Sequence, residues 1–129
     1  MTTTRVLVVD DSAITRALLV RTLERAGFTV IEAEDGIEGA VVALRERPDV
    51  VVTDLEMPTM DGTQLLRLLK SDPATAHAPV LIVTSHGEAP SRYWGLQTGA
   101  DAYLTKDHRP EELVDAVTRL VAAAPPPAE

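Results

Sequence analysis

The chain contains no cysteine, and its basic residues are scarce. Without cysteine it can form no disulfide, no thiolate nucleophile and no cysteine-ligated zinc site. Lysine and arginine number 12 against 20 aspartate and glutamate residues, which gives a net charge of -8. A protein that binds nucleic acid normally needs a basic face, and anionic lipid repels an acidic surface. We therefore expect no direct contact with nucleic acid and no docking on membranes.

Long apolar runs and common leader patterns are also missing. No stretch approaches the roughly 20 apolar residues of a transmembrane helix, so we expect no membrane insertion. The polar start at Thr2, Thr3, Thr4 and Arg5 does not fit a secretory signal. No G-x-G-x-x-G motif follows the first apolar run, which disfavours a dinucleotide-binding site. A length of 129 residues with 45% hydrophobic and 25% charged residues is typical of one globular domain, which we expect to be cytoplasmic.

Five short apolar runs predict five strands. The runs at 6–9, 50–52 and 80–83 are continuous and rich in β-branched residues. Continuous runs of this length suit strands that are covered on both faces, as in a parallel sheet. The mixed run at 28–33 and the very short run at 102–104 predict strands at the two edges.

Helical spacing of apolar residues occupies the segments between these runs. Helices are expected around 14–23, 37–44, 65–69, 91–98 and 113–121, with Gly27 ending the first of them. Strands and helices thus alternate five times. This alternation predicts an α/β fold with a single doubly wound, five-stranded parallel sheet. Three fully apolar strands in the centre and two weaker strands at the edges suggest the order 2-1-3-4-5. In such a sheet, ligands bind at the carboxyl ends of the strands, beside the point where the strand order reverses.

Polar residues follow the predicted strands at that same edge. They are Asp10, Asp11, Asp54, Thr84, Ser85 and Lys106. Three carboxylates in one crevice repel one another unless a cation compensates, and oxygen ligands without histidine or cysteine favour Mg²⁺ over Ca²⁺. A neighbouring ammonium and hydroxyl complete a phosphoryl-transfer site in which a carboxylate is the nucleophile. Taken singly, each carboxylate fits a helix cap or a solvated loop better than a site, and Lys106 alone fits a surface lysine better; their joint placement favours the site.

Four segments resemble the receiver domain of two-component response regulators, and the resemblance extends from Arg5 to about Val121. The segments are Val6-Leu7-Val8-Val9-Asp10-Asp11-Ser12, Val52-Thr53-Asp54-Leu55-Glu56-Met57-Pro58-Thr59-Met60-Asp61-Gly62, Val83-Thr84-Ser85 and Gly99-Ala100-Asp101-Ala102-Tyr103-Leu104-Thr105-Lys106. The resemblance implies a flavodoxin-like (βα)5 fold. We assign 1–123 to the receiver domain and, because Pro125, Pro126 and Pro127 follow the last predicted helix, 124–129 to a proline-rich tail or linker.

The resemblance also implies a phosphoacceptor site that depends on Mg²⁺. Asp54 would accept a phosphoryl group from a histidine kinase or a phosphotransfer protein. Asp11, Asp54 and the backbone carbonyl of Glu56 would bind Mg²⁺, with Asp10 acting mainly through a metal-bound water. Lys106 would pair with the phosphoryl oxygens. The chain would then catalyse nothing beyond its own phosphorylation and dephosphorylation.

Further residues are implied to switch or tune this site. The Thr84 hydroxyl would turn toward the phosphate and Tyr103 would swing inward, which would change a partner-binding surface made of helix 91–98, the fifth strand and the fifth helix. That surface would bind a downstream protein or drive a phosphorylation-dependent homodimer. Glu56 and His86 would tune dephosphorylation, although His86 equally fits an exposed loop. Gly62 would take a backbone angle that is costly for other residues.

Two features depart from the family pattern, and two other functions stay open. Asp107 follows Lys106 where the family usually has proline, and Arg109, a poor capping residue, precedes Pro110 at the expected start of the fifth helix. The chain could be the N-terminal receiver of a longer regulator with a DNA-binding or nucleotide-cyclase output. A remote alternative is an aspartyl-phosphate phosphatase, which is disfavoured because Glu56 stands where such enzymes carry a second aspartate.

Overall fold

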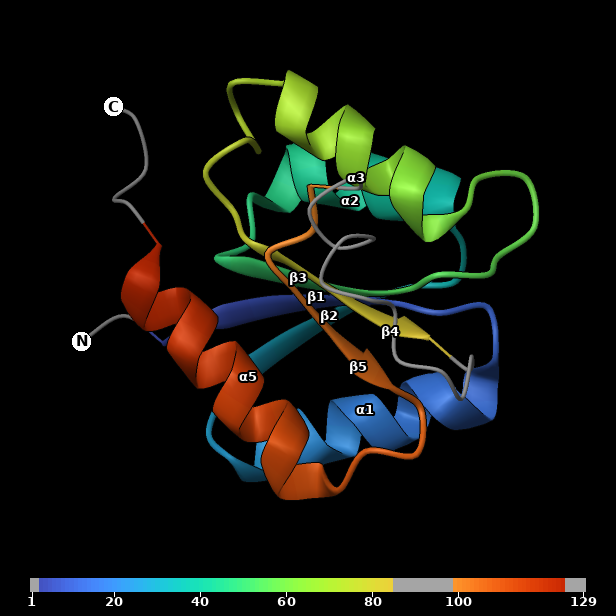
Figure 1. Ribbon diagram of the computed structural model, residues 1–129. Coiled ribbons are helices and arrows are strands. Elements are labelled where there is room, and N and C mark those ends of the chain that lie inside the picture. The colour runs from blue at the N-terminus through green and yellow to red at the C-terminus, as the bar shows by residue number, and fades with distance from the viewer. Residues whose placement is uncertain (1–2, 85–98, 125–129) are drawn as a thin grey trace.

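The computed structural model describes residues 3–84 and 99–124, and it contains one parallel sheet (Figure 1). The strands are β1 (Arg5–Val9), β2 (Thr29–Ala33), β3 (Val50–Asp54), β4 (Val80–Thr84) and β5 (Ala102–Thr105). Every neighbouring pair is parallel, and the order is β2-β1-β3-β4-β5. The predicted fold class and strand order are therefore confirmed.

Four of the five predicted helices lie in the described part of the chain. They are α1 (Ala13–Arg25), α2 (Gly36–Glu46), α3 (Gly62–Ser71) and α5 (Pro110–Ala123). The helix predicted at 91–98 lies outside the described residues, as do Ser85 and His86. Among the described helices, none combines the length and the apolar character needed to cross a bilayer.

The helices cover both faces of the sheet because side chains alternate along each strand. Leu7, Val51 and Ile82 point into one core cluster, beneath α2 and α3, and Val8, Val52 and Leu81 point into the other, beneath α1 and α5. Figure 1 shows the two helix pairs on opposite sides of the sheet. The central strands are buried on both faces, as their continuous apolar runs predicted, whereas β2 and β5 are partly exposed at the edges.

The end of α1 follows the predicted glycine signal. Gly27 has a φ of 97°, and its N–H donates to the Glu24 carbonyl at 3.0 Å. The Phe28 N–H donates to the Leu23 carbonyl at 3.1 Å. These two bonds form a Schellman motif, in which a glycine in the left-handed region closes the helix at low conformational cost.

The segment between β5 and α5 carries the two departures from the family pattern. Asp107 accepts a hydrogen bond from the Thr105 hydroxyl, and no cis peptide bond occurs in the described residues. Helix α5 begins at Pro110, as predicted, with Arg109 as its N-cap. The Arg109 side chain has no acceptor to offer the helix, but its backbone N–H donates to Glu112 Oε1 at 3.0 Å. The helix start is therefore held by a glutamate within its first turn.

Candidate functional site

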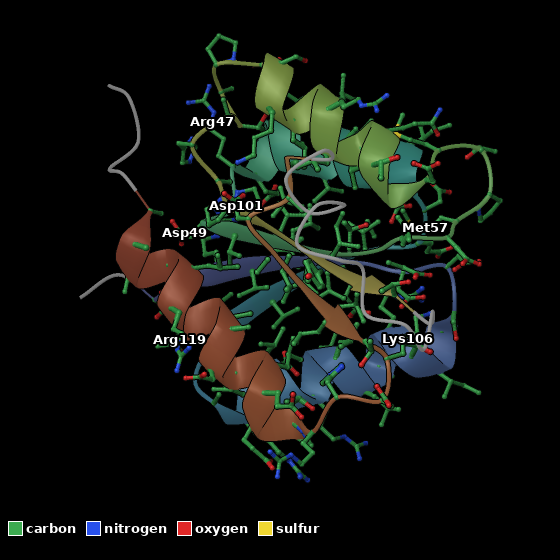
Figure 2. All side chains as sticks on the ribbon, viewed as in Figure 1. Arg47, Asp49, Met57, Asp101, Lys106 and Arg119 are labelled. Atoms are coloured by element: carbon green, nitrogen blue, oxygen red, sulfur yellow. The ribbon has the colours of Figure 1, made fainter. Side chains whose placement is uncertain are left out.

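The carboxyl ends of the central strands bring the predicted site residues to one edge of the sheet. Asp10 follows β1, Asp54 is the last residue of β3, Thr84 is the last residue of β4, and Lys106 follows β5. The Lys106 N–H donates to the Thr84 carbonyl at 2.7 Å, which aligns the ends of β4 and β5. Figure 2 shows Lys106 at this edge together with Met57, from the loop after β3.

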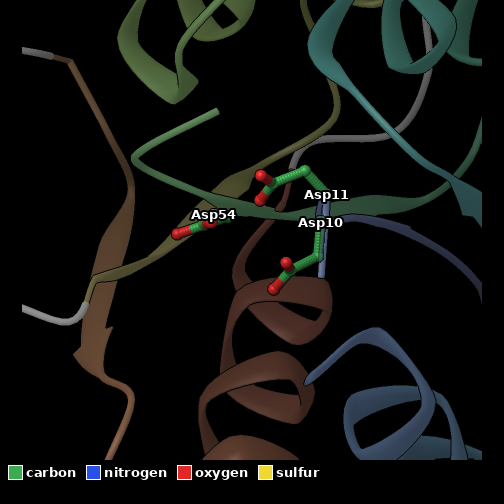
Figure 3. A group of neighbouring side chains, drawn as sticks. All are labelled: Asp10, Asp11 and Asp54. Atoms are coloured by element: carbon green, nitrogen blue, oxygen red, sulfur yellow. The ribbon is translucent and has the colours of Figure 1, made fainter. Parts of the chain in front are cut away.

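Three carboxylates meet at this edge. One oxygen from each of Asp10, Asp11 and Asp54 lies within 4.8 Å of the other two, and Figure 3 shows the three side chains directed toward a common space. Asp10 is 0% exposed and Asp54 is 3% exposed, whereas Asp11 is exposed to solvent. Two buried negative charges thus share one pocket with a third at its rim.

The polar partners of these carboxylates are few. Asp10 Oδ1 accepts the Ser12 N–H at 2.8 Å, but Asp10 Oδ2 is a buried oxygen without a hydrogen bond. Asp54 Oδ1 accepts the Glu56 N–H at 3.4 Å. Lys106 Nζ lies 3.4 Å from Asp54 Oδ2 and 3.9 Å from Asp10 Oδ2. Within the described residues, the site therefore gathers more negative than positive charge.

Burial dominates the electrostatics of the two inner carboxylates. It raises the pKa of Asp10 above the usual value, although the Ser12 N–H and the Lys106 ammonium act in the opposite direction. Burial also raises the pKa of Asp54, and the neighbouring Asp10 charge raises it further against the opposing effect of Lys106. A divalent cation would supply the positive charge that this pocket lacks.

Acidic residues at the amino ends of the strands, opposite the carboxylate cluster, have hydrogen-bond partners that Asp10 Oδ2 lacks (Figure 2). Asp49 Oδ2 accepts the Arg5 N–H at 2.8 Å, and Asp101 Oδ2 accepts the Val80 N–H at 2.8 Å and lies 3.1 Å from Lys70 Nζ. These carboxylates satisfy backbone donors at the strand starts. A carboxylate with an unbonded, fully buried oxygen is found instead at the edge where Asp10 and Asp54 meet.

The comparison with protein families decides the affiliation of the chain. The model of the response regulator receiver domain matches residues 6–118. The chain belongs to this family. The resemblance inferred from the sequence motifs is thereby confirmed, and the protein is a signalling domain of two-component response regulators.

Individual relatives differ in how much of their length this receiver domain spans. It is 39% identical to the protein PilH of Pseudomonas aeruginosa over 92% of this chain and 98% of PilH. It is 40% identical to the phosphate regulon transcriptional regulatory protein PhoB of Klebsiella pneumoniae, over 95% of this chain but only 53% of PhoB. The solved structure of the chemotaxis protein CheY4 of Vibrio cholerae is 31% identical, with a TM-score of 0.84 over 92% of this chain and 99% of CheY4.

The loop after β3 shapes the rim of the site, and one sequence expectation about it is wrong. Gly62 does not adopt a left-handed backbone angle, because positive φ among glycines is confined to Gly27 and Gly99 in the described residues. Its requirement is steric: a Cβ at this position would lie 2.5 Å from the Asp54 carbonyl oxygen. The Gly62 N–H donates to the Leu55 carbonyl at 2.8 Å. This close approach holds the loop against the end of β3.

The other implied residues of the receiver site lie in distinct environments. Thr84 is 0% exposed at the end of β4. Tyr103 is partly buried in β5, where it pairs in register with Ile82 and packs against the core beneath α2 and α3. Glu56 is exposed and lines an open depression beside Asp11. His86 lies outside the described residues.

Two supporting residues are absent from the predictions made on sequence alone. Ser12 donates its N–H to Asp10 and caps α1 by accepting the Thr15 N–H at 3.3 Å. Arg16 Nη1 donates to the Asp10 carbonyl at 2.7 Å, and its Nε lies 3.2 Å from Glu32 Oε1. A serine directly before an apolar helical pattern is an N-cap signal that identifies Ser12. No comparable sequence signal identifies Arg16.

Proposed function

We propose that this receiver domain is a phosphorylation-dependent switch in which Asp54 accepts a phosphoryl group from a histidine kinase or a phosphotransfer protein. The observation that carries the proposal is the convergence of the Asp54 carboxylate with two further carboxylates and with Lys106 Nζ, 3.4 Å away. A carboxylate is a competent nucleophile for phosphoryl transfer. A neighbouring ammonium stabilises the charge that spreads over the transferred oxygens.

The residues at this edge fit a bound Mg²⁺. The donor set consists of oxygens only, and Asp10 Oδ2 is buried without a hydrogen bond. In the proposal, the carboxylates of Asp10, Asp11 and Asp54 and the Glu56 carbonyl hold the ion, with Asp10 acting through water. When bound, Mg²⁺ supplies charge neutralisation for the carboxylates and for the phosphoryl oxygens.

The positions of the Asp54 and Lys106 side chains support the following transfer step. An Asp54 carboxylate oxygen forms a bond to phosphorus while the phosphorus–nitrogen bond of the donor phosphohistidine breaks, and the imidazole nitrogen keeps the electron pair. Lys106 pairs with the phosphoryl oxygens, and the Thr84 hydroxyl donates a hydrogen bond to one of them. In the proposal, Glu56 and His86 tune the lifetime of the acyl phosphate.

The output of the switch is proposed to be a change in a protein-binding surface. Tyr103 follows the Thr84 hydroxyl inward, and this shifts the populations of two states of the surface formed by β5, α5 and the predicted helix at 91–98. A downstream protein, or a second phosphorylated copy, binds the new arrangement. In this proposal, residues 1–123 form the switch, 124–129 form a linker, and the chain turns over no substrate except its own phosphate.

Acetyl phosphate provides a direct test that does not require the cognate kinase. The protein is incubated with acetyl phosphate and Mg²⁺, and its intact mass is measured. We expect one added phosphate on the wild type, none on Asp54→Asn, and none on the wild type with EDTA. Asp49→Asn, which removes a carboxylate from the opposite edge of the sheet, is the matched control and should be labelled normally. Equal labelling of Asp54→Asn would show that another residue is the acceptor.

The tuning residues need a separate measurement of decay. After excess acetyl phosphate is removed, the loss of the added mass is followed with time in Glu56→Ala and His86→Ala. Both variants should still be labelled, and each should lose its phosphate at a rate different from that of the wild type. Identical decay in both variants and the wild type would remove Glu56 and His86 from the proposed mechanism.

A further inference from the structure

Helix α2 carries an apolar stripe on its solvent face. Ile37, Val41 and Leu44 are 52%, 54% and 41% exposed, whereas Ala40 and Ala43 of the same helix are buried. The spacing i, i+4, i+7 places the three exposed side chains on one side of the helix over two turns. In Figure 1, α2 lies beside α3 on one face of the sheet, across from α1 and α5. The stripe is therefore separate from the α5 side of the proposed switch surface.

Two opposite charges border this stripe along the same side. Glu38 directly follows Ile37 and Arg45 directly follows Leu44, so the two charged residues are seven positions, or about two helical turns, apart. Glu38 is exposed and Oε1 accepts the Glu34 N–H at 3.1 Å. The Arg45 side chain is 65% exposed and approaches Glu46 Oε2 at 3.3 Å. Both therefore remain accessible to a partner helix.

We propose that this face binds a second copy of the chain through antiparallel packing of the two α2 helices. A two-fold axis beside Val41 places Val41 against its counterpart and Ile37 opposite Leu44 of the second copy. The same axis brings Glu38 opposite Arg45 of the second copy, and Arg45 opposite its Glu38. A surface that is complementary to itself in this way is the requirement for an isologous dimer.

The charge pattern selects the antiparallel arrangement over the parallel one. In a parallel pair, each residue lies level with the same residue of the second copy. The side of one helix that carries Glu38 and Arg45 then faces the side of the other helix that lacks them. In the antiparallel pair, the charged sides meet, and each Glu38 lies opposite an Arg45 of the other copy. Interhelical charges at these flanking positions are known to set partner choice and orientation in helix pairs.

The size of the stripe sets the expected affinity. Two turns of one helix form a small interface, and interfaces below about 1,200 Å² belong to weak complexes. We expect association in the range of about 10 µM to 1 mM. Because the interface excludes the carboxylate cluster, association does not require phosphorylation and is retained in Asp54→Asn.

Sedimentation over this concentration range tests the proposal on the full chain. We expect Val41→Glu to weaken dimerisation at least tenfold, because it places two carboxylates face to face on the axis. Leu18→Glu is the matched control, since Leu18 is an equally apolar residue of α1 that is 60% exposed, and it should dimerise like the wild type. A wild type that stays monomeric throughout, or a dimer that survives Val41→Glu, overturns the proposal.

A charge exchange tests the orientation. Glu38→Arg and Arg45→Glu should each weaken dimerisation several-fold, because each creates like-charged pairs across the axis. The double variant reverses both partners together and should regain most of the wild-type affinity. Urea unfolding of each variant separates loss of association from loss of the fold, since Glu38 also binds the Glu34 N–H. Absence of recovery in a folded double variant overturns the antiparallel pairing.

Discussion

Replacing Asp10 by asparagine is expected to stabilise the protein when no divalent cation is present. Asp10 is fully buried, and Oδ2 has no hydrogen bond. Asparagine keeps an oxygen for the Ser12 N–H and removes the charge. Without metal, the substitution therefore removes an unfavourable buried charge and keeps the hydrogen bond from the Ser12 N–H.

The magnitude follows from the distances in the site. At an effective dielectric constant of about 20, a second negative charge within 4.8 Å costs about 3.5 kcal/mol or more, and the Lys106 ammonium at 3.9 Å returns about 4 kcal/mol. Two carboxylates outweigh one ammonium, although solvent screens the exposed Asp11. Burial adds a desolvation penalty. We expect the free energy of unfolding to rise by about 1–3 kcal/mol, which is about 4–12 °C in the unfolding midpoint.

Urea unfolding with EDTA and with Mg²⁺ measures both parts of this prediction. A ligand at a concentration of about 100 times its dissociation constant stabilises the folded state by about 2.7 kcal/mol, so Mg²⁺ should stabilise the wild type and much less Asp10→Asn. Asp35→Asn, at the N-cap of α2, also changes a carboxylate that accepts a backbone N–H, and it should not stabilise the protein. Destabilisation of metal-free Asp10→Asn, or an undiminished Mg²⁺ effect in it, would refute the reasoning.

The stabilisation by Asp10→Asn is also expected to depend on pH, because it comes from removing the Asp10 charge. The pKa of Asp10 is raised in the folded state, chiefly by burial, so the folded protein takes up its proton at a higher pH than the unfolded chain. The wild type loses stability as pH rises through the folded pKa. The advantage of Asp10→Asn should therefore reach its full size only above the folded pKa of Asp10, and it should disappear below about pH 4, near the pKa of an unfolded aspartate. An advantage that is constant with pH would exclude ionisation of Asp10 as its cause.

Three further substitutions probe the surroundings of the site. Gly62→Ala should lower the free energy of unfolding by about 2 kcal/mol or more in urea titrations, because its Cβ would lie 2.5 Å from the Asp54 carbonyl oxygen. A loss below about 0.5 kcal/mol, the size of an ordinary surface change, would show that the loop moves to accept the methyl group. Asp61→Ala should cost about 1 kcal/mol at pH 7, because Asp61 caps α3. Hydrogen bonds from Thr63 and Gln64 lower the pKa of Asp61, so this cost should shrink as pH falls through that pKa, and a cost that is equal at pH 7 and pH 2 would contradict the charged cap. Lys106→Ala should slow labelling by acetyl phosphate about 10²-fold or more if its ammonium stabilises the phosphoryl oxygens, and labelling at the wild-type rate would remove it from the mechanism.

The sheet and the strand-end residues were predictable because both depend on local patterns. Continuous apolar runs identify strands covered on both faces, and the residues after those runs must lie at the carboxyl edge once the strands are parallel. Asp10, Asp54, Thr84 and Lys106 were placed at that edge on these grounds, and the structure brings them there. The helix end at Gly27, which has a left-handed backbone angle, was also predictable, because a glycine after a helical pattern is a local stop signal.

The environment of these residues depends on how the chain folds back after each strand, which short sequence motifs do not specify. Gly62 was correctly singled out but for the wrong reason, because the crowding arises from the Asp54 carbonyl and not from its own backbone angle. Arg16 reaches the Asp10 carbonyl only because α1 packs back across the end of β1. A helical sequence pattern does not predict which backbone carbonyl a side chain such as that of Arg16 will contact.

The sequence by itself determined which segments are strands and helices, which polar residues stand at their ends, and the family to which they belong, because periodicity and short motifs are properties of neighbouring residues. Tertiary structure alone decided that Asp10 Oδ2 is buried without a partner and that Ile37, Val41 and Leu44 of α2 stay exposed. Burial, desolvation and exposure are set by what packs against a side chain, and that depends on how all the layers of the fold come together.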